Sequence, residues 1–371
     1  MIPLFRPAFD QREVKAVTAV LRSGWIGSGP KVDQFETKFA RFVGAKYAVA
    51  VSSASSALQL ALQGLALKAG GEVISSSLTF IATNHAILLN NLTPVFCDID
   101  PDTLCADPAD IAHRITPKTK AVIIMHYGGH PVDLNPLVKL CRRHKLYLIE
   151  DCAHATGSYY KGRHVGTFST LGCFSFAAIK NLTAGDGGMI VTNNRRLADR
   201  LKVLRWSGIS KDTWHRSSTQ KYSWEYDVVA ISGKHQMNDI AAAIGLVQLT
   251  KLRHTNSRRL VLTRRYNLKL KHIPWLTLPI VKPWAISSHH NYVIKIDPKT
   301  RNKLIDHLSA QGVASSVHYL PTHHYRLYRR FATKLPVTDS VWRHILLLPL
   351  YPTLTYRQQD QVIAAIRRFN P

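Results

Sequence analysis

The chain has 371 residues, 46% of them hydrophobic, and a formal net charge of +26 at pH 7. This length predicts two domains, or one large domain with a smaller appendage, and the apolar content excludes a disordered chain. The positive charge comes as dispersed doublets such as Arg142-Arg143 and Arg258-Arg259, without a basic tail or zinc-finger spacing, so solvated helix faces are favoured over a nucleic-acid site.

Two helices are expected before the first strand. Asp10-x-x-Glu13 resembles a capping box that opens a helix to about Leu21. The glycine-rich segment 25–30 separates it from a second helix, whose apolar side chains recur at helical spacing: Val32, Phe35, Phe39 and Phe42.

From Tyr47 short apolar strands alternate with helices. The expected strands are Tyr47–Val51, Glu72–Ser76, Val95–Ile99, Ala121–Met125 and Leu146–Ile149. The expected helices follow Ser52–Ser56, begin at Thr79, and cover Pro108–His113 and Asp133–His144. This alternation predicts an α/β fold with a largely parallel sheet covered on both faces. Ligands of such sheets bind beyond the carboxyl ends of the strands.

The pattern changes in the second half of the chain. A small-residue helix follows Asp239, and a long basic helix begins near Thr255. A strand at Asn291–Ile296, a helix at Lys299–Gln311, a strand ending in 317–324 and a terminal packing helix follow. We therefore predict a large domain at 1–252 and a smaller C-terminal α+β domain at 253–371.

Lys180 is the strongest catalytic candidate. It lies between two buried strand-like runs, Gly172–Phe176 and Gly188–Thr192, as the tip of their connection. A desolvated lysine loses its proton readily and can form a Schiff base with an aldehyde cofactor. A solvated loop lysine is the alternative on local grounds.

Four further groups follow strands in the same half of the chain. Ser52–Ser56 offers a helix N-terminus for a phosphate, and Phe80 offers a ring for stacking. Asp151 can pair with a buried cation, and Ser175 can contact a phosphate. Each has an ordinary structural alternative, as a cap or a core residue. Together with Lys180 they fit pyridoxal phosphate, which needs a lysine, a carboxylate at its ring nitrogen, a stacking residue and a phosphate cradle.

Five segments, in order, make a family resemblance specific. They are Trp25–Lys31, Ala50–Leu58, Glu150–Ala155, Ser175–Asn181 and Gly185–Gly188. The chain resembles the DegT/StrS family of sugar aminotransferases over essentially its whole length. The resemblance implies the aspartate-aminotransferase fold of PLP-dependent transferases and a homodimer with shared active sites. It also implies amino transfer from an amino acid, usually glutamate, to a keto group of a nucleotide-linked sugar.

The same resemblance implies roles for individual residues. Lys180 would bind the cofactor aldehyde and shuttle protons, and Asp151 would bind the pyridine nitrogen. The remaining cofactor contacts would be Phe80, His154, Ser175, Ala54 and Ser55, with Lys234 reaching the neighbouring subunit's cofactor phosphate. Trp25, His318 and Tyr319 would face the substrate, and loops around Trp25, Trp206–Trp214 and His318 would set the sugar.

This chain departs from the family pattern at two of these places. Ala54-Ser55 stands where Gly-Thr is common, which keeps a hydroxyl but gives up backbone freedom, and Asp186 stands where glutamate is frequent. Relatives with histidine at the lysine position dehydrate their substrates, so Lys180 favours transamination. A keto-cyclitol aminotransferase and a non-catalytic polyanion-binding relative stay open as alternatives.

Three other patterns bear on location and on metals. The N-terminus lacks a signal-peptide layout, no apolar run spans a bilayer, and the five cysteines lack C-x-x-C spacing, so a soluble cytoplasmic protein is expected. The histidines near His323 lie in one loop without a carboxylate partner there, so no metal site is expected.

Overall fold

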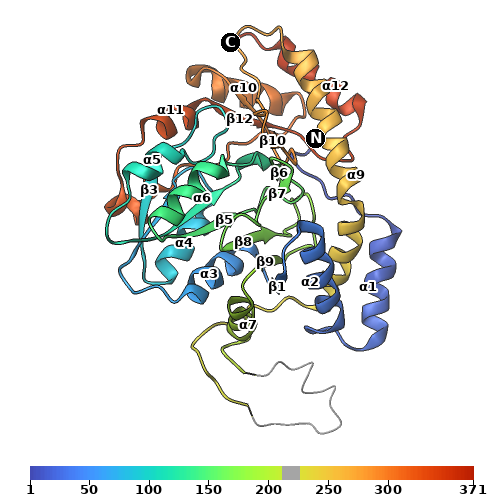
Figure 1. The fold of residues 1–371 in the computed structure, drawn as a ribbon. Helices are drawn as coiled ribbons and strands as arrows, with labels where there is room; N and C mark the ends of the chain where they lie inside the picture. The colour runs from blue at the N-terminus through green and yellow to red at the C-terminus, as the bar shows by residue number, and fades with distance from the viewer. Residues whose placement is uncertain (211–225) are drawn as a thin grey trace.

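A seven-stranded sheet forms the centre of the chain, which the computed structural model describes over residues 1–210 and 226–371 (Figure 1). Its strand order is β1-β9-β8-β5-β4-β2-β3. The bounds are β1 (Tyr47–Val51), β2 (Glu72–Ser76), β3 (Thr93–Cys97), β4 (Thr119–Met125), β5 (Tyr147–Asp151), β8 (Leu171–Ser175) and β9 (Gly188–Thr192). Only β9 pairs antiparallel, with β1 and β8, so the mostly parallel sheet is confirmed.

Helices cover both faces of this sheet, and its strands are therefore buried on both sides. One face carries α3 (Ala54–Leu65), α4 (Ile81–Leu89) and α7 (Arg195–Leu204). The other carries α2 (Pro30–Val43), α5 (Pro108–His113), α6 (Leu134–Arg143) and the start of α9 (Asp239–Leu270). The two apolar layers leave the carboxyl ends of the parallel strands as the place where polar groups gather.

The N-terminal helices are fixed by identifiable caps. Helix α1 (Gln11–Ser23) begins with the predicted capping box of Asp10 and Glu13, and it packs against α9. Helix α2 is capped by a distant side chain, Asp239. Its Oδ1 accepts N–H groups of Gly29 and Val32, both at 3.0 Å, and its Oδ2 accepts that of Lys31 at 3.1 Å. The start of α9 therefore holds the start of α2.

The C-terminal part has its own apolar core, built on β11 (Tyr292–Lys295) paired with β12 (Ile345–Leu348). Its helices are α10 (Pro298–Ala310), α11 (Pro336–His344) and α12 (Tyr356–Arg368). Short elements complete the description: β6 (Tyr159–Tyr160), β7 (Arg163–His164), β10 (Ala285–Ile286), η1 (Tyr127–Gly129), η2 (Thr322–His324) and η3 (Arg326–Phe331).

Two expectations about this part are wrong. The helices predicted after Asp239 and from Thr255 form one continuous helix, α9, because no proline or glycine turn interrupts the run. The strand predicted to end in 317–324 is not a strand, since only an isolated bridge of Ser316 with Leu347 pairs there. The predicted boundary at residue 252 falls inside α9. Among the described residues, no helix has the length and apolarity needed to cross a membrane.

Candidate active site

Lys180 lies on the connection between two buried strands, as predicted. These strands are β8 and β9, which pair with each other in antiparallel orientation. The connection is folded back on itself, since Phe176 N–H donates to Gly187 O and Ala184 N–H donates to Phe176 O, both at 2.8 Å. Dense protein surroundings lower the pKa of Lys180 to about 8, although its side chain keeps some contact with solvent. An amine with this pKa is about one tenth unprotonated at pH 7, far more than an ordinary lysine.

Asp151 ends β5, beside β8, and is almost fully buried. Burial raises its pKa, while hydrogen bonds from Thr83 and Ala153 and the charge of Lys180 oppose that rise. Thr83 Oγ1 donates to Oδ2 at 2.7 Å, and Ala153 N–H donates to Oδ1 at 3.0 Å. Because β5 and β8 are neighbouring strands, Asp151 and Lys180 are close enough to interact: the Lys180 charge lowers the pKa of Asp151, and the Asp151 charge raises the pKa of Lys180.

His154 and Tyr319 form a second pair beside Lys180. Tyr319 Oη lies 3.1 Å from His154 Nε2, and Gly128 N–H donates to His154 Nδ1 at 3.3 Å. Burial, followed by the charge of Lys180, holds the pKa of His154 well below its usual range, so this ring is neutral. Burial also raises the pKa of the Tyr319 phenol, which therefore stays a hydroxyl.

His318 and Phe80 border the same group. The His318 ring stacks on Tyr319 with centroids 4.7 Å apart, and burial together with Lys180 lowers its pKa to about 4. The Phe80 ring lies 5.7 Å from that of Tyr319, and the residue is 51% exposed. An exposed aromatic face beside Tyr319 is available for a planar ring.

The N-terminus of α3 lies next to this connection. Ser53 Oγ accepts the N–H of Ser56 at 3.1 Å, which leaves the N–H groups of Ala54 and Ser55 without an intrahelical acceptor. Gly188, at the start of β9, approaches Ser53 so closely that an added Cβ would lie 2.5 Å from its carbonyl. Ser175 is buried opposite Gly188, so a helix N-terminus, a glycine and a serine adjoin here.

Two predicted residues occupy other surroundings. Lys234 is exposed, and its Nζ lies 5.3 Å from the centre of the Trp206 ring. Trp25 folds over Gly29 and donates its Nε1–H to Ser28 O at 3.2 Å. Trp214, the end of one expected specificity loop, lies outside the described residues.

Sequence reasoning missed several residues that hydrogen-bond to the site residues or pack against them. Thr83 holds Asp151, and Tyr127 donates to the carbonyl of His318. The His290 ring lies tilted against that of His154, with centroids 4.2 Å apart, and its Nδ1 lies 3.0 Å from Asn181 Oδ1. Thr79 and Thr83 are four residues apart on the expected helix, and this spacing was the sequence signal that could have pointed to Thr83.

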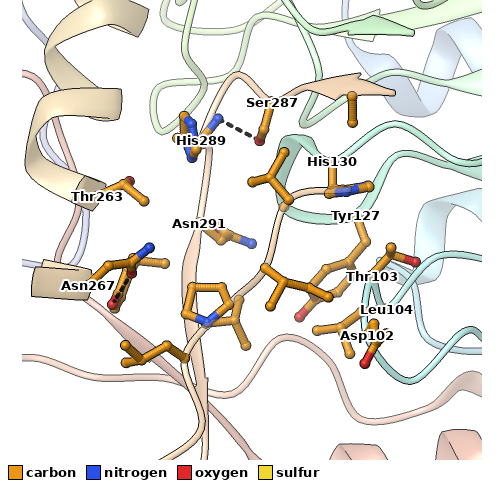
Figure 2. A pocket seen from close by; sticks show the side chains of 18 of the residues that line it. Asp102, Thr103, Leu104, Tyr127, His130, Thr263, Asn267, Ser287, His289 and Asn291 are labelled. Atoms are coloured by element: carbon orange, nitrogen blue, oxygen red, sulfur yellow. Dashed lines mark hydrogen bonds between the residues drawn. The ribbon is translucent and has the colours of Figure 1, made fainter. Parts of the chain in front are cut away.

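A separate cavity of about 650 Å³ lies behind η1, between α9 and the segment before β11 (Figure 2). Thr263 and Asn267 of α9 line it, with His289 and Asn291 opposite. It shares Tyr127 and Gly128 with the site above, but neither Lys180 nor Asp151 lines it. This cavity is therefore distinct from the place where the reactive groups meet.

Comparisons with known proteins agree on one family. The model of the DegT/DnrJ/EryC1/StrS aminotransferase family matches residues 7–367. The spore coat polysaccharide biosynthesis protein SpsC of Bacillus subtilis is 40% identical, over 99% of this chain and 96% of that protein.

Solved structures extend this likeness to the fold. Helicobacter pylori PseC, an aminotransferase involved in the biosynthesis of pseudoaminic acid, superposes with a TM-score of 0.92 at 29% identity, over 99% of this chain and 98% of that one. The PLP form of Spr1654, a putative sugar aminotransferase of Streptococcus pneumoniae, gives 0.92 at 28% identity over the whole of both chains. The expected aspartate-aminotransferase-like fold is thus confirmed, and the chain belongs to the DegT/DnrJ/EryC1/StrS aminotransferase family.

Proposed function

We propose that this chain uses pyridoxal phosphate to transfer an amino group from an amino acid, glutamate in our proposal, to a keto group of a nucleotide-linked sugar. The observation that carries the proposal is the meeting of Lys180, with its pKa near 8, and the buried carboxylate of Asp151 in one site. The names of SpsC and PseC support a carbohydrate substrate, since they refer to a coat polysaccharide and to pseudoaminic acid.

The residues present fit pyridoxal phosphate. Asp151 Oδ1 and Oδ2 each accept one hydrogen bond from the protein, which leaves acceptor capacity for a protonated ring nitrogen. The half-exposed ring of Phe80 suits stacking, and the N–H groups of Ala54 and Ser55 suit a phosphate. The solved PLP form of Spr1654 supports the same cofactor.

The chain's own groups suit proton transfer. When bound, the cofactor supplies an electron sink for the carbon that loses a proton. Lys180 Nζ, with a pKa near 8, can accept and release a proton close to neutral pH, as a general base must. Asp151 would keep the ring nitrogen protonated. Neutral His154 lies within hydrogen-bond distance of the Tyr319 hydroxyl and so holds it within the group of residues around Lys180.

A homodimer with shared active sites is part of the proposal. Lys234 and the neighbouring apolar side chains are exposed: Tyr226, Val228, Val229 and Ile231, the last at 96%. An apolar run of this exposure favours contact with another subunit. Lys234 would then reach the phosphate bound by that subunit, and Trp25 would face the sugar.

The test is an assay of the purified protein with nucleotide-linked keto sugars and glutamate, measuring 2-oxoglutarate release. We expect a yellow protein whose colour and activity are lost in Lys180→Ala. Turnover of keto-cyclitols, but not of nucleotide-linked keto sugars, would show that the substrate is a cyclitol rather than a sugar. A colourless protein that binds DNA in a salt-dependent way would refute the enzyme assignment.

A further inference from the structure

Two consecutive histidines lie close in space to an aspartate that belongs to a later helix. His323 and His324 end η2, and Asp339 belongs to α11. Asp339 Oδ1 lies 3.1 Å from His323 Nε2 and 2.8 Å from His324 Nε2. The fold thus supplies the carboxylate partner that the loop sequence itself lacks.

Hydrogen bonds to neighbouring residues position the side chains that carry these ligand atoms. Ser77 Oγ lies 2.7 Å from His323 Nδ1, so the opposite nitrogen, Nε2, faces Asp339. The first turn of α11 is anchored by Asp98, whose Oδ1 accepts the N–H of Thr338 at 2.7 Å and its hydroxyl at 2.6 Å. A hydrogen bond to the outer nitrogen is the usual support of a metal-binding imidazole.

The cluster is open to solvent on one side. His324 and Asp339 side chains are each 36% exposed, while that of His323 is 7% exposed. A second cluster of ligand types, His126, Glu150 and Cys152, is fully buried. The Glu150 oxygens already accept three backbone N–H groups and face His126, so protein groups already satisfy this carboxylate.

We propose that His323 Nε2, His324 Nε2 and Asp339 Oδ1 bind one divalent transition-metal ion of the zinc type, with water completing its coordination. Two imidazoles and one carboxylate suit Zn²⁺, Co²⁺ or Ni²⁺, whereas Mg²⁺ and Ca²⁺ prefer oxygen ligands alone. Binding requires both rings neutral and unprotonated at Nε2. For His323 the ring proton then resides on Nδ1, where Ser77 Oγ accepts it.

The ion would join η2, which follows the loop of the proposed active site, to α11. Residue 322, the first of η2, is tied to the large domain, since its N–H donates to Ser77 O and its hydroxyl accepts from Asn84 Nδ2, both at 2.8 Å. Tyr319 lies three residues earlier on the same loop. Metal binding would therefore fix the loop that carries Tyr319, without taking part in the chemistry.

The test is isothermal titration of the purified holoenzyme with ZnCl₂, together with the visible spectrum of added Co²⁺. Wild type should bind one Zn²⁺ per chain, and His324→Ala and Asp339→Asn should each weaken binding at least tenfold. His272→Ala is the matched control, because His272 is an exposed histidine of the same C-terminal part and lies outside the cluster.

Folding of the variants is checked by near-ultraviolet circular dichroism, and His324→Gln, a change at an exposed position, replaces any variant that fails this check. The proposal is overturned if wild type binds no Zn²⁺, or if the cluster variants bind it as tightly as wild type does. Because the readout is metal binding alone, the outcome is independent of the aminotransferase assignment.

Discussion

Thr83→Val removes a side-chain hydroxyl that donates to Asp151 while keeping the shape of the side chain. The bond is short, at 2.7 Å, and both residues are 2% exposed. A buried hydrogen bond to a charged group contributes about 1.5–3 kcal/mol. At 1.36 kcal/mol per unit, its loss should raise the pKa of Asp151 by about 1–2 units beyond the rise that burial already causes.

The sign of the effect follows from which form of Asp151 is needed. A carboxylate can hold a protonated ring nitrogen only above its own pKa. When that pKa is raised, the pH below which affinity for pyridoxal phosphate falls should increase by about 1–2 units. Affinity at pH 6 should fall about tenfold or more, and affinity at pH 9 should change least.

The assay is a titration of cofactor-free protein with pyridoxal phosphate, followed by absorbance from pH 5 to 9. Thr192→Val is the control, because Thr192 is 4% exposed and donates at 2.9 Å to a neutral carbonyl, that of Thr170, remote from the site. It should lower stability by about 0.5–1.5 kcal/mol and leave the pH profile unchanged. An unshifted profile in a folded Thr83→Val protein would refute the reasoning.

Three other outcomes are expected. Amine-specific labelling of Lys180 in cofactor-free protein, followed by peptide mass spectrometry, should be half-maximal near pH 8, because the lowered pKa frees the amine there; a midpoint above pH 10 would contradict it. Gly188→Ala should weaken cofactor affinity about tenfold in the same absorbance titration, since the new Cβ would meet the Ser53 backbone at 2.5 Å; unchanged affinity would count against the cradle. Asp239→Ala should lower the free energy of unfolding in urea by about 1–3 kcal/mol, because three N–H groups before and in α2 lose their acceptor; an unchanged midpoint would show that water replaces it.

Local patterns were sufficient for much of the large domain. The alternation from Tyr47 onward predicted the sheet, and β1, β2 and β9 were predicted with the bounds that the structure gives. Lys180 and Asp151 could be found because each follows or ends a buried strand, where parallel sheets gather their chemistry.

Contacts between distant residues were beyond the sequence pattern. Thr83 acts on Asp151 across 68 positions, and Asp339 meets His323 across 16, so neither pairing leaves a periodic trace. The C-terminal part was harder for the same reason, since the loop around His318 is held by Tyr127 and Ser316 rather than by a regular strand. The roles of Trp25 and Lys234 depend on a second subunit and stay predictions.

Helix α9 runs without interruption for 32 residues, about 48 Å, past the boundary expected at residue 252 (Figure 1). Its Leu252 belongs to the apolar core of the large domain, and its Tyr266 and Leu270 belong to that of the C-terminal part. This single helix is thus embedded in both cores. Any tilt of one part relative to the other must therefore bend this helix or shift it within one of the two cores, and either change would reach Asp239 and the start of α2 that it caps.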